Sequence, residues 1–184
     1  MKKPNETKRS SDEAVKAKTG KLWAEWFKIL DNAGAKKMPH KEISAYLRDT
    51  HDVTPWWCQM VAVAYEHERG IRQQFQKCDG AFSASGSRTI DAPLAKAYAA
   101  WTDEKLRQRW LPEAPMEITT ATPGKYVRAK WDGGTRLSVG FYGTPAGKTC
   151  VAVDHEKLAS TKECAKMKSY WFEALDRLQE ILEA

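Results

Sequence analysis

The stretch SRTIDAPLAKAYAAWTDEKLRQRWLP, Ser87 to Pro112, decides the fold of the larger part of this chain. In its first residues, side chains of different character alternate as they do along a β-strand. Pro93 then stands at the start of a first short helix. Thr102 can cap a second short helix, and Pro112 prevents that helix from continuing. The stretch therefore predicts an edge strand followed by two short helices.

The segments around this stretch predict an antiparallel sheet and a long final helix. Between Ala81 and His155 the sequence forms five short alternating runs, separated by Pro-Gly, Asp-Gly-Gly and Pro-Ala-Gly turns. From Lys162 to Ala184 the apolar residues return to a helical period. Two short helices after an edge strand can close one end of a curved sheet that grips the last helix. We therefore expect an α+β fold for residues 81–184.

The preceding residues predict a separate three-helix domain. Apolar residues recur at helical spacing from Lys21 onward, Gly34 can end the first helix in a left-handed conformation, and Thr54 and Pro55 can begin the third. We predict a disordered basic leader at 1–18, a three-helix domain at 19–70, a polar linker at 71–80 and the α+β domain at 81–184.

Composition limits the classes of function. The net charge is +6, and residues 1–21 hold seven Lys and Arg against three Asp and Glu. The leader is thus expected to add only weak, salt-sensitive attraction to nucleic acid. No apolar run is long enough to span a bilayer or to form a signal peptide, and the four cysteines contain no CxxC pair. We therefore expect a soluble, cytoplasmic protein with reduced thiols and no membrane contact.

The order of elements and the words within them resemble the START-like superfamily, also called SRPBCC, which has the helix-grip fold. The likeness is greatest to homologues of the heat-shock-protein ATPase activator, and the matching residues are Ser87, Ile90, Ala92, Pro93, Tyr98, Ala100, Trp101, Thr102, Asp103, Arg109 and Trp110. The resemblance implies an antiparallel sheet wrapped on the C-terminal helix. Five strands are fewer than such sheets usually have, so a large ligand cavity is not expected.

The N-terminal part resembles a small bacterial helical domain of unknown function. The resemblance rests on TGK at Thr19, HKEI at His40, WW-x-Q at Trp56 and YE at Tyr65. It implies a helical fold and brings no activity.

Strand alternation and the helical period place a set of side chains on facing surfaces of the α+β domain. They can line an apolar pocket or fill a dry core. The candidates are Tyr98, Trp110, Val127, Trp131, Val139, Phe141, Val153, His155, Trp171 and Leu175.

His155 is the most interesting polar member of that set. It can act as a general base at the mouth of a pocket, or as a structural hydrogen-bonding group at a strand end. No second catalytic residue stands at a recognisable spacing, and the sequence contains no GxxxxGK[ST], GxGxxG, HExxH or GxSxG motif. We assign no catalytic residue, no cofactor and no metal ligand.

The segment from His40 to Glu66 has the outline of a helix-turn-helix. The turn looks too long for the tight DNA-binding form, and the second helix lacks the cations that contact DNA grooves. We expect Trp56 and Trp57 to contact a protein partner instead.

These observations favour a non-enzymatic binding module. It would take a small apolar ligand in the grip, or a protein partner on the sheet or the Trp-rich helical face. The alternative is a DNA-binding regulator with a ligand-sensing START-like domain.

Overall fold

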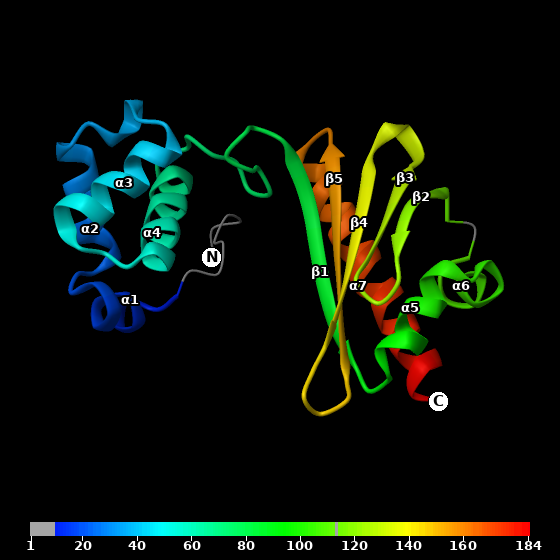
Figure 1. Cartoon of the computed structure of the whole chain (residues 1–184). Coiled ribbons are helices and arrows are strands. Elements are labelled where there is room, and N and C mark those ends of the chain that lie inside the picture. The colour runs from blue at the N-terminus through cyan, green and yellow to red at the C-terminus, as the bar shows by residue number, and fades with distance from the viewer. Residues whose placement is uncertain (1–9, 113) are drawn as a thin grey trace, which may run out of the picture. The chain divides into compact units, whose positions relative to one another are not determined.

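The computed structural model describes residues 10–112 and 114–184, and the chain divides into two compact units, 1–80 and 81–184 (Figure 1). The helical unit holds α1 (Asp12–Thr19), α2 (Trp23–Asn32), η1 (Ala35–Lys37), α3 (His40–His51) and α4 (Pro55–Glu68). The grip unit holds β1 (Phe82–Ile90), α5 (Leu94–Thr102), α6 (Glu104–Trp110), β2 (Met116–Thr122), β3 (Tyr126–Trp131), η2 (Asp132–Gly134), β4 (Arg136–Gly143), β5 (Thr149–Leu158) and α7 (Thr161–Glu183).

Helix α1 corrects the prediction of a disordered leader. The Ser11 hydroxyl accepts a hydrogen bond from the Ala14 N–H, and Gly20 ends the helix at φ 78°. Val15 is fully buried in the core of the helical unit, where it gives an otherwise charged helix an anchor. The prediction is therefore wrong for residues 12–18, while residues 1–9 lie outside the described part of the chain.

The remaining helices form around a core that they share. The side chains that are almost completely buried in it include Trp26, Leu30, Ile43, Leu47, Val61 and Tyr65. Gly34 adopts the predicted left-handed conformation after α2, at φ 73°. Thr54 precedes α4 as predicted, but its side chain makes no capping hydrogen bond, and Pro55 occupies the first turn.

The predicted linker begins as part of the helical unit. The N–H groups of Ile71 and Arg72 both donate to the Glu66 carbonyl, at 2.9 and 3.2 Å. The His67 ring also contacts the Arg72 carbonyl, at 3.1 Å. The segment after α4 therefore folds back over the end of that helix.

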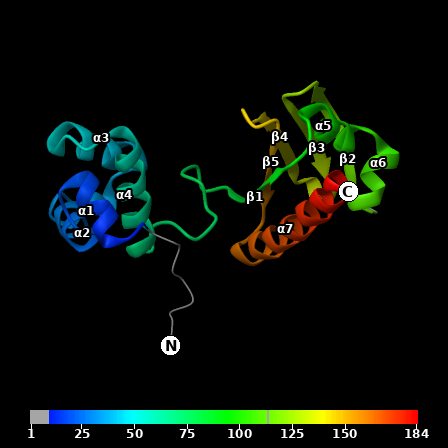
Figure 2. The same ribbon diagram turned by 90° about the horizontal axis from the view of Figure 1, so that it is seen from below.

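The grip unit confirms the α+β prediction. Its antiparallel sheet has the order β1-β5-β4-β3-β2, and α7 packs along one face (Figures 1 and 2). At Gly86 in β1 an added Cβ would lie 3.8 Å from Leu175 Cδ1, so the helix crosses that strand closely. The face that carries α7 is the inner face, and the opposite one is the outer sheet face.

The stretch 87–112 forms the strand and two short helices expected of it. The cap of α6 differs from the prediction, because Asp103 rather than Thr102 accepts the N–H groups of Lys105 and Leu106. The Thr102 hydroxyl instead donates to the Tyr98 carbonyl within α5. The Trp110 indole donates to the Ala100 carbonyl, which joins the two helices.

Candidate functional site

The structure brings the predicted pocket residues together on the inner face of the sheet. Tyr98 and Trp131 are half-buried, and the other eight members of the set are at most 3% exposed. Their rings pack directly on one another. Tyr98 lies edge-on to Phe141 at 5.4 Å between centroids, and Trp131 lies edge-on to Trp171 at 5.1 Å. In this arrangement the side chains form the hydrophobic core of the unit.

His155 has both ring nitrogens engaged within this core. The Trp171 indole donates to its Nδ1 at 3.1 Å, so the ring proton is on Nε2, which lies 2.8 Å from Thr135 Oγ1. The Thr135 hydroxyl in turn donates to the Asp132 carbonyl at 3.0 Å. Burial lowers the pKa of His155 below 6.5 and keeps the ring neutral. The ring links α7 to the β3–β4 turn, and neither nitrogen is available to a substrate.

Trp101 is a polar feature of the grip that sequence reasoning did not single out as a site. Its side chain is fully buried beside Trp110 and Trp171, and its indole N–H has no hydrogen-bond partner among the described residues. A buried donor of this kind calls for an acceptor, such as a water or a ligand atom. The residue stands within the AAWTD word, but the direction of its N–H depends on the tertiary packing.

Trp56 is the most exposed tryptophan of the helical unit, at 58%. It stands edge-on to Trp57, with 4.7 Å between ring centroids and an interplanar angle of 87°. Trp57 is buried and also contacts Trp23. Of the two predicted partner-binding residues, therefore, Trp56 is exposed, whereas Trp57 is buried and packs against the Trp56 ring.

The turn between α3 and α4 is shorter than predicted. α3 ends at His51 and α4 begins at Pro55, so only three residues connect them, with Asp52 in a left-handed conformation and Val53 buried. This length is typical of a helix-turn-helix. The prediction of an overlong turn is wrong, because α3 continues through residues that the HDVTP word was expected to interrupt. Helix α4 nevertheless contains no lysine or arginine.

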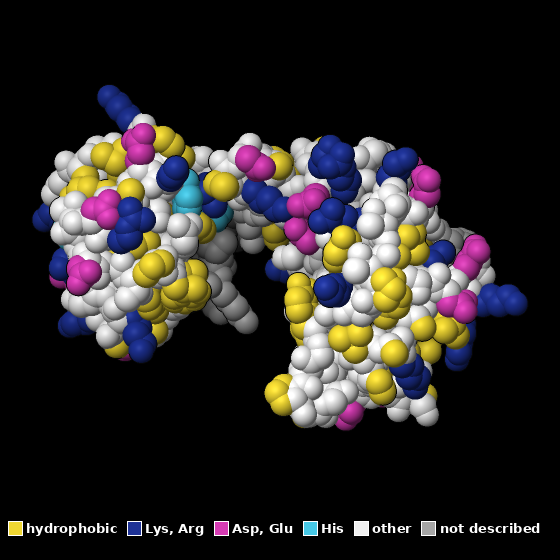
Figure 3. All heavy atoms as spheres, in the orientation of Figure 1, with side chains coloured by type: hydrophobic (Ala, Val, Ile, Leu, Met, Phe, Trp, Pro, Cys, Tyr) yellow, Lys and Arg dark blue, Asp and Glu magenta, His cyan; other side chains and the backbone are white. Residues whose placement is uncertain are grey.

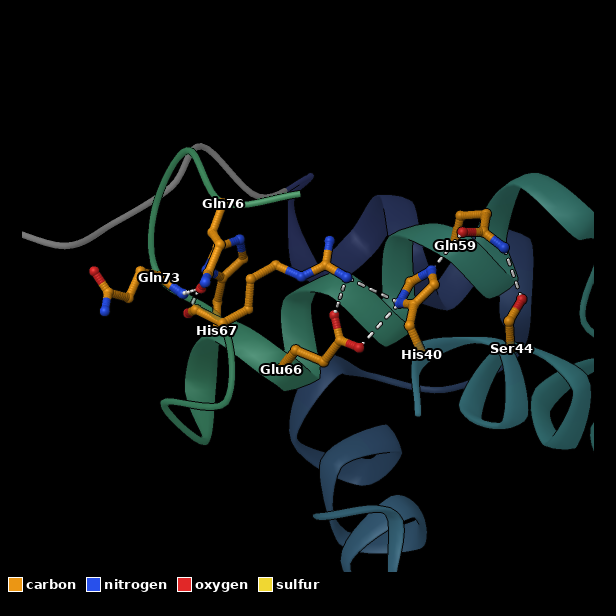
Figure 4. Close-up of polar contacts among 8 residues, drawn as sticks. His40, Ser44, Gln59, Glu66, His67, Gln73 and Gln76 are labelled. Atoms are coloured by element: carbon orange, nitrogen blue, oxygen red, sulfur yellow. Dashed lines mark hydrogen bonds and ion pairs between the residues drawn. The ribbon is translucent and has the colours of Figure 1, made fainter. Parts of the chain in front are cut away.

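A polar cluster built around the buried Glu66 in the helical unit, which we call the Glu66 cluster, consists of His40, Ser44, Gln59, Glu66 and Arg72 (Figure 4). Glu66 is 3% exposed; its Oε1 lies 3.0 Å from His40 Nδ1, and its Oε2 lies 2.7 Å from an Arg72 nitrogen. The Arg72 contact is between opposite charges, without an aligned hydrogen bond to Oε2.

Gln59 completes the cluster on its far side. The His40 Nε2 lies 2.6 Å from Gln59 Oε1, and the Gln59 amide nitrogen donates to Ser44 Oγ at 2.8 Å. The cluster borders a hollow of about 230 Å³ that Met38, Ile71 and Gln76 also line. The HKEI, WW-x-Q and YE motifs were recognised in the sequence, but the contact between their side chains was not predicted.

A nearby ion pair supports the same unit. Arg69 makes a bidentate contact with Asp31, at 2.6 Å for the shortest pair, and the Tyr65 hydroxyl also donates to Asp31. The Arg69 hydrogen bonds lower the pKa of Asp31 to about 2. Burial raises the pKa of Tyr65 to about 12. Both groups therefore keep one protonation state over the neutral range and act as fixed structural contacts.

In residues 10–112 and 114–184, no group of three or more His, Cys, Asp or Glu is arranged to hold a metal ion. No helix in these ranges is long and apolar enough to cross a membrane. All four cysteines are free thiols.

Comparison with known proteins assigns a family to the first unit and a fold to the second. Residues 7–67 match the family described as "Domain of unknown function (DUF4287)". No curated protein has a sequence significantly similar to this chain.

Solved structures match with TM-scores close to 0.5. The solution structure of the Aha1 dimer from Colwellia psychrerythraea is 19% identical with a TM-score of 0.50, over 55% of this chain and 96% of that one. CalU16 from Micromonospora echinospora is 18% identical with a TM-score of 0.50, over 55% and 76%. A conserved protein of unknown function from Enterococcus faecalis is 15% identical with a TM-score of 0.51, over 65% and 81%.

These matches confirm both resemblances that the sequence suggested. The chain carries an N-terminal DUF4287 domain, followed by a unit with the helix-grip fold of Aha1-like proteins. At such low identity the structural likeness establishes the fold of the grip unit and leaves its activity open to proposal.

Proposed function

We propose that the chain is a non-enzymatic cytoplasmic binding module that contacts a protein partner through Trp56. The observation that carries the proposal is the exposure of Trp56, 58%, on a ring that Trp57 holds in place. Tryptophan is enriched among the residues that contribute most to protein–protein binding, and a side chain fixed before binding loses little entropy on association.

The histidines at the centres of the two polar networks support a binding role over a catalytic one. His155 has both nitrogens occupied in the core, and His40 has both occupied within the Glu66 cluster. A general base needs a nitrogen within reach of substrate. In each case the ring instead connects secondary-structure elements.

The experiment places a photoreactive benzoyl-phenylalanine at position 56 in cells of the protein's own host. Position 142 serves as the control, because Tyr142 is 61% exposed and lies in the other unit. We expect a discrete cross-linked product from position 56 only, and its partner is identified by mass spectrometry. With the purified partner, Trp56→Ala should then weaken the complex at least about tenfold.

Two results would contradict this role. One is equal cross-linking from positions 56 and 142. The other is a partner that binds the Trp56→Ala variant as tightly as the unchanged chain, with circular dichroism showing that the variant is folded.

A small ligand inside the grip is the second candidate, and the Trp101 indole favours it. A largely apolar molecule with one acceptor atom would satisfy that buried N–H. In this case Trp101→Phe, which keeps most of the ring and removes the donor, should reduce the amount of carried ligand. The test is the mass of native protein before and after denaturation.

The short turn between α3 and α4 is compatible with the DNA-binding alternative, but α4 lacks the basic side chains that such a helix uses to contact DNA. A regulator of this kind should bind DNA with a steep salt dependence that survives deletion of residues 1–9. The absence of lysine and arginine from α4 weighs against groove contacts by that helix, and we do not propose this function.

A further inference from the structure

Helix α4 is apolar on its solvent-facing side as well as on the side that faces the core. Its inner side is buried in the helical unit, with Val61 and Tyr65 fully enclosed. Its outer side carries Trp56, which is 58% exposed, and the half-buried Met60 and Val63. Figure 3 shows hydrophobic side chains gathered around the lower end of this helix. A helix that is hydrophobic all round is normally covered on all sides.

Helix α7 shows the more usual arrangement, with charged residues on its outer side. Lys166, Lys168 and Glu173 are exposed there, while the apolar stripe is buried. Helix α4 contains no lysine or arginine, and its acids, Glu66 and Glu68, both lie in its last turn. The outer side of α4 is thus uncharged before that turn, and a depletion of charge is typical of the centre of a protein–protein interface.

The outer residues have the spacing of a coiled-coil contact. A helix advances about 100° per residue, so positions separated by four, three and four residues fall within an arc of about 60°. Two helices that pack side by side use this spacing, in which the contact positions are d, a, d and a of successive heptads. On α4 these positions, which we call the α4 seam, are Trp56, Met60, Val63 and His67.

The α4 seam is complementary to its own reverse. When a two-fold axis relates two antiparallel copies of α4, Met60 faces the partner's Val63, and Trp56 faces the partner's His67. Each contact occurs twice, because a two-fold interface repeats every pair. The long, flexible methionine can fill the space beside the shorter, branched valine.

The ends of the α4 seam also suit an antiparallel pair. The Nδ1 atom of His67 lies 3.1 Å from the Arg72 carbonyl of the same chain, which holds the ring in place. The contact with the partner's Trp56 is then ring against ring and needs no new hydrogen bond. The antiparallel arrangement also places the N-terminus of each α4, which has no side-chain cap, beside the C-terminus of the other, where the helix dipoles attract.

We propose that α4 is a homodimer interface, in which two copies pack their α4 seams antiparallel. The inference rests on the function proposed above, because it names a second copy of this chain as the partner of Trp56. Helix α4 has 14 residues and is therefore about 21 Å long. The contact is at the small end of specific interfaces, so the dimer is weak, and its uncharged centre makes it little sensitive to salt.

Sedimentation velocity of the full chain over about 5 to 200 μM tests the proposal and its register. Met60→Glu and Val63→Lys each place a charge against an apolar side chain of the partner. Each variant alone should lose at least about tenfold in dimer affinity, with circular dichroism showing that it is folded. An equal mixture of the two should recover much of that loss, since the two new charges then face each other while the second central contact stays unchanged.

A mixture of Met60→Glu with Met60→Lys is the matched control. In the antiparallel register both of these charges face Val63 of the other copy, so this mixture should not recover affinity. Leu106→Lys, at an exposed apolar position in the grip unit, should leave dimerisation unchanged.

Two results would overturn the proposal. One is a wild-type chain that stays monomeric at the highest concentration. The other is a mixture of Met60→Glu and Val63→Lys that associates no better than the control mixture. A cross-link from position 56 to a different protein would in either case leave the proposed function standing, whereas the lack of any cross-link from that position would remove both.

Discussion

The two units of this chain each hold a histidine in a hydrogen-bonded network, and the two networks differ in charge. His155 contacts neutral groups, a tryptophan indole and a threonine hydroxyl. His40 contacts the buried carboxylate of Glu66, which Arg72 also approaches. The grip network therefore resembles a core with polar atoms satisfied, whereas the Glu66 cluster holds opposite charges out of water.

This difference in charge determines how much stability each unit should lose when one member of its network is substituted. A neutral network loses roughly one hydrogen bond when one partner is removed, together with the cost of an unsatisfied group. A buried charged network leaves an uncompensated charge, which costs considerably more. The histidine alone does not distinguish the neutral network from the charged one, because His155 and His40 each have both ring nitrogens occupied.

The largest effect is expected from Glu66→Gln. The substitution keeps the volume and leaves the Arg72 guanidinium, with a side chain only 12% exposed, without its counter-charge. We expect a loss of about 3–5 kcal/mol in the stability of the helical unit, measured by amide hydrogen exchange during urea unfolding. Adding Arg72→Met should recover part of this loss. A decrease below about 3 kcal/mol, within the range expected for a neutral network, would contradict this account of the cluster.

A smaller effect is expected in the grip from Thr135→Val. This change removes the acceptor of the His155 Nε2–H, and the ring cannot move its proton to Nδ1, because the Trp171 donor points at that atom. The expected loss is about 1–3 kcal/mol in the unfolding of the grip unit. Thr122→Val, at a half-buried position on β2, is the matched control and should change stability little.

The two units should also differ in their response to mild acid. Burial lowers the pKa of His155 in the folded state below its usual 6.5, so the unfolded chain takes up a proton first as pH falls. Stability of the grip unit should therefore decline below pH 6.5, by at most about 1.4 kcal/mol per pH unit, and level off below the folded pKa.

His155→Gln isolates this contribution, since it removes the titrating group and should flatten the slope between pH 7 and 5. The Asp31–Arg69 pair of the helical unit behaves differently, because its stabilisation is fully present above the unfolded aspartate pKa of about 3.9 and is lost only as pH falls from there through the folded pKa of about 2. Urea titrations of the grip unit at several pH values provide the measurement. An equal slope in the variant would contradict the assignment to His155.

The smallest effect on stability is expected from Trp56→Ala. The ring is largely exposed, so its removal should change the free energy of unfolding of the helical unit by less than about 0.5 kcal/mol. Chemical denaturation checks this value. A loss of several kcal/mol would make Trp56 a structural residue and would remove the main support for its role in partner binding.

Local patterns allowed much of the fold to be predicted. The prolines that bound 93–112, the alternation of the strands and the stripe on α7 each depend on neighbouring residues, and all three appear in the structure. The errors occurred where a distant contact decides the outcome. Val15 orders α1 because other helices supply a core for it, and a single apolar residue among charges gave no sign of this.

The candidate sites show the same limit. The grip residues could be placed on one face from strand parity, and they do meet in one cluster. The Glu66 cluster could not be predicted, since His40 and Glu66 are 26 residues apart and meet only through the packing of α3 on α4. Whether a buried indole such as Trp101 finds an acceptor likewise depends on atoms that sequence patterns do not place.

Native mass spectrometry of protein purified from its own host tests the central claim most directly. That claim is that the grip interior is filled by its own side chains and that the chain binds partners through its surface. We predict the same mass for the native chain and for the denatured chain. A native mass in excess of the chain, lost on denaturation and absent from the Trp101→Phe variant, would show a ligand inside the grip and contradict the account.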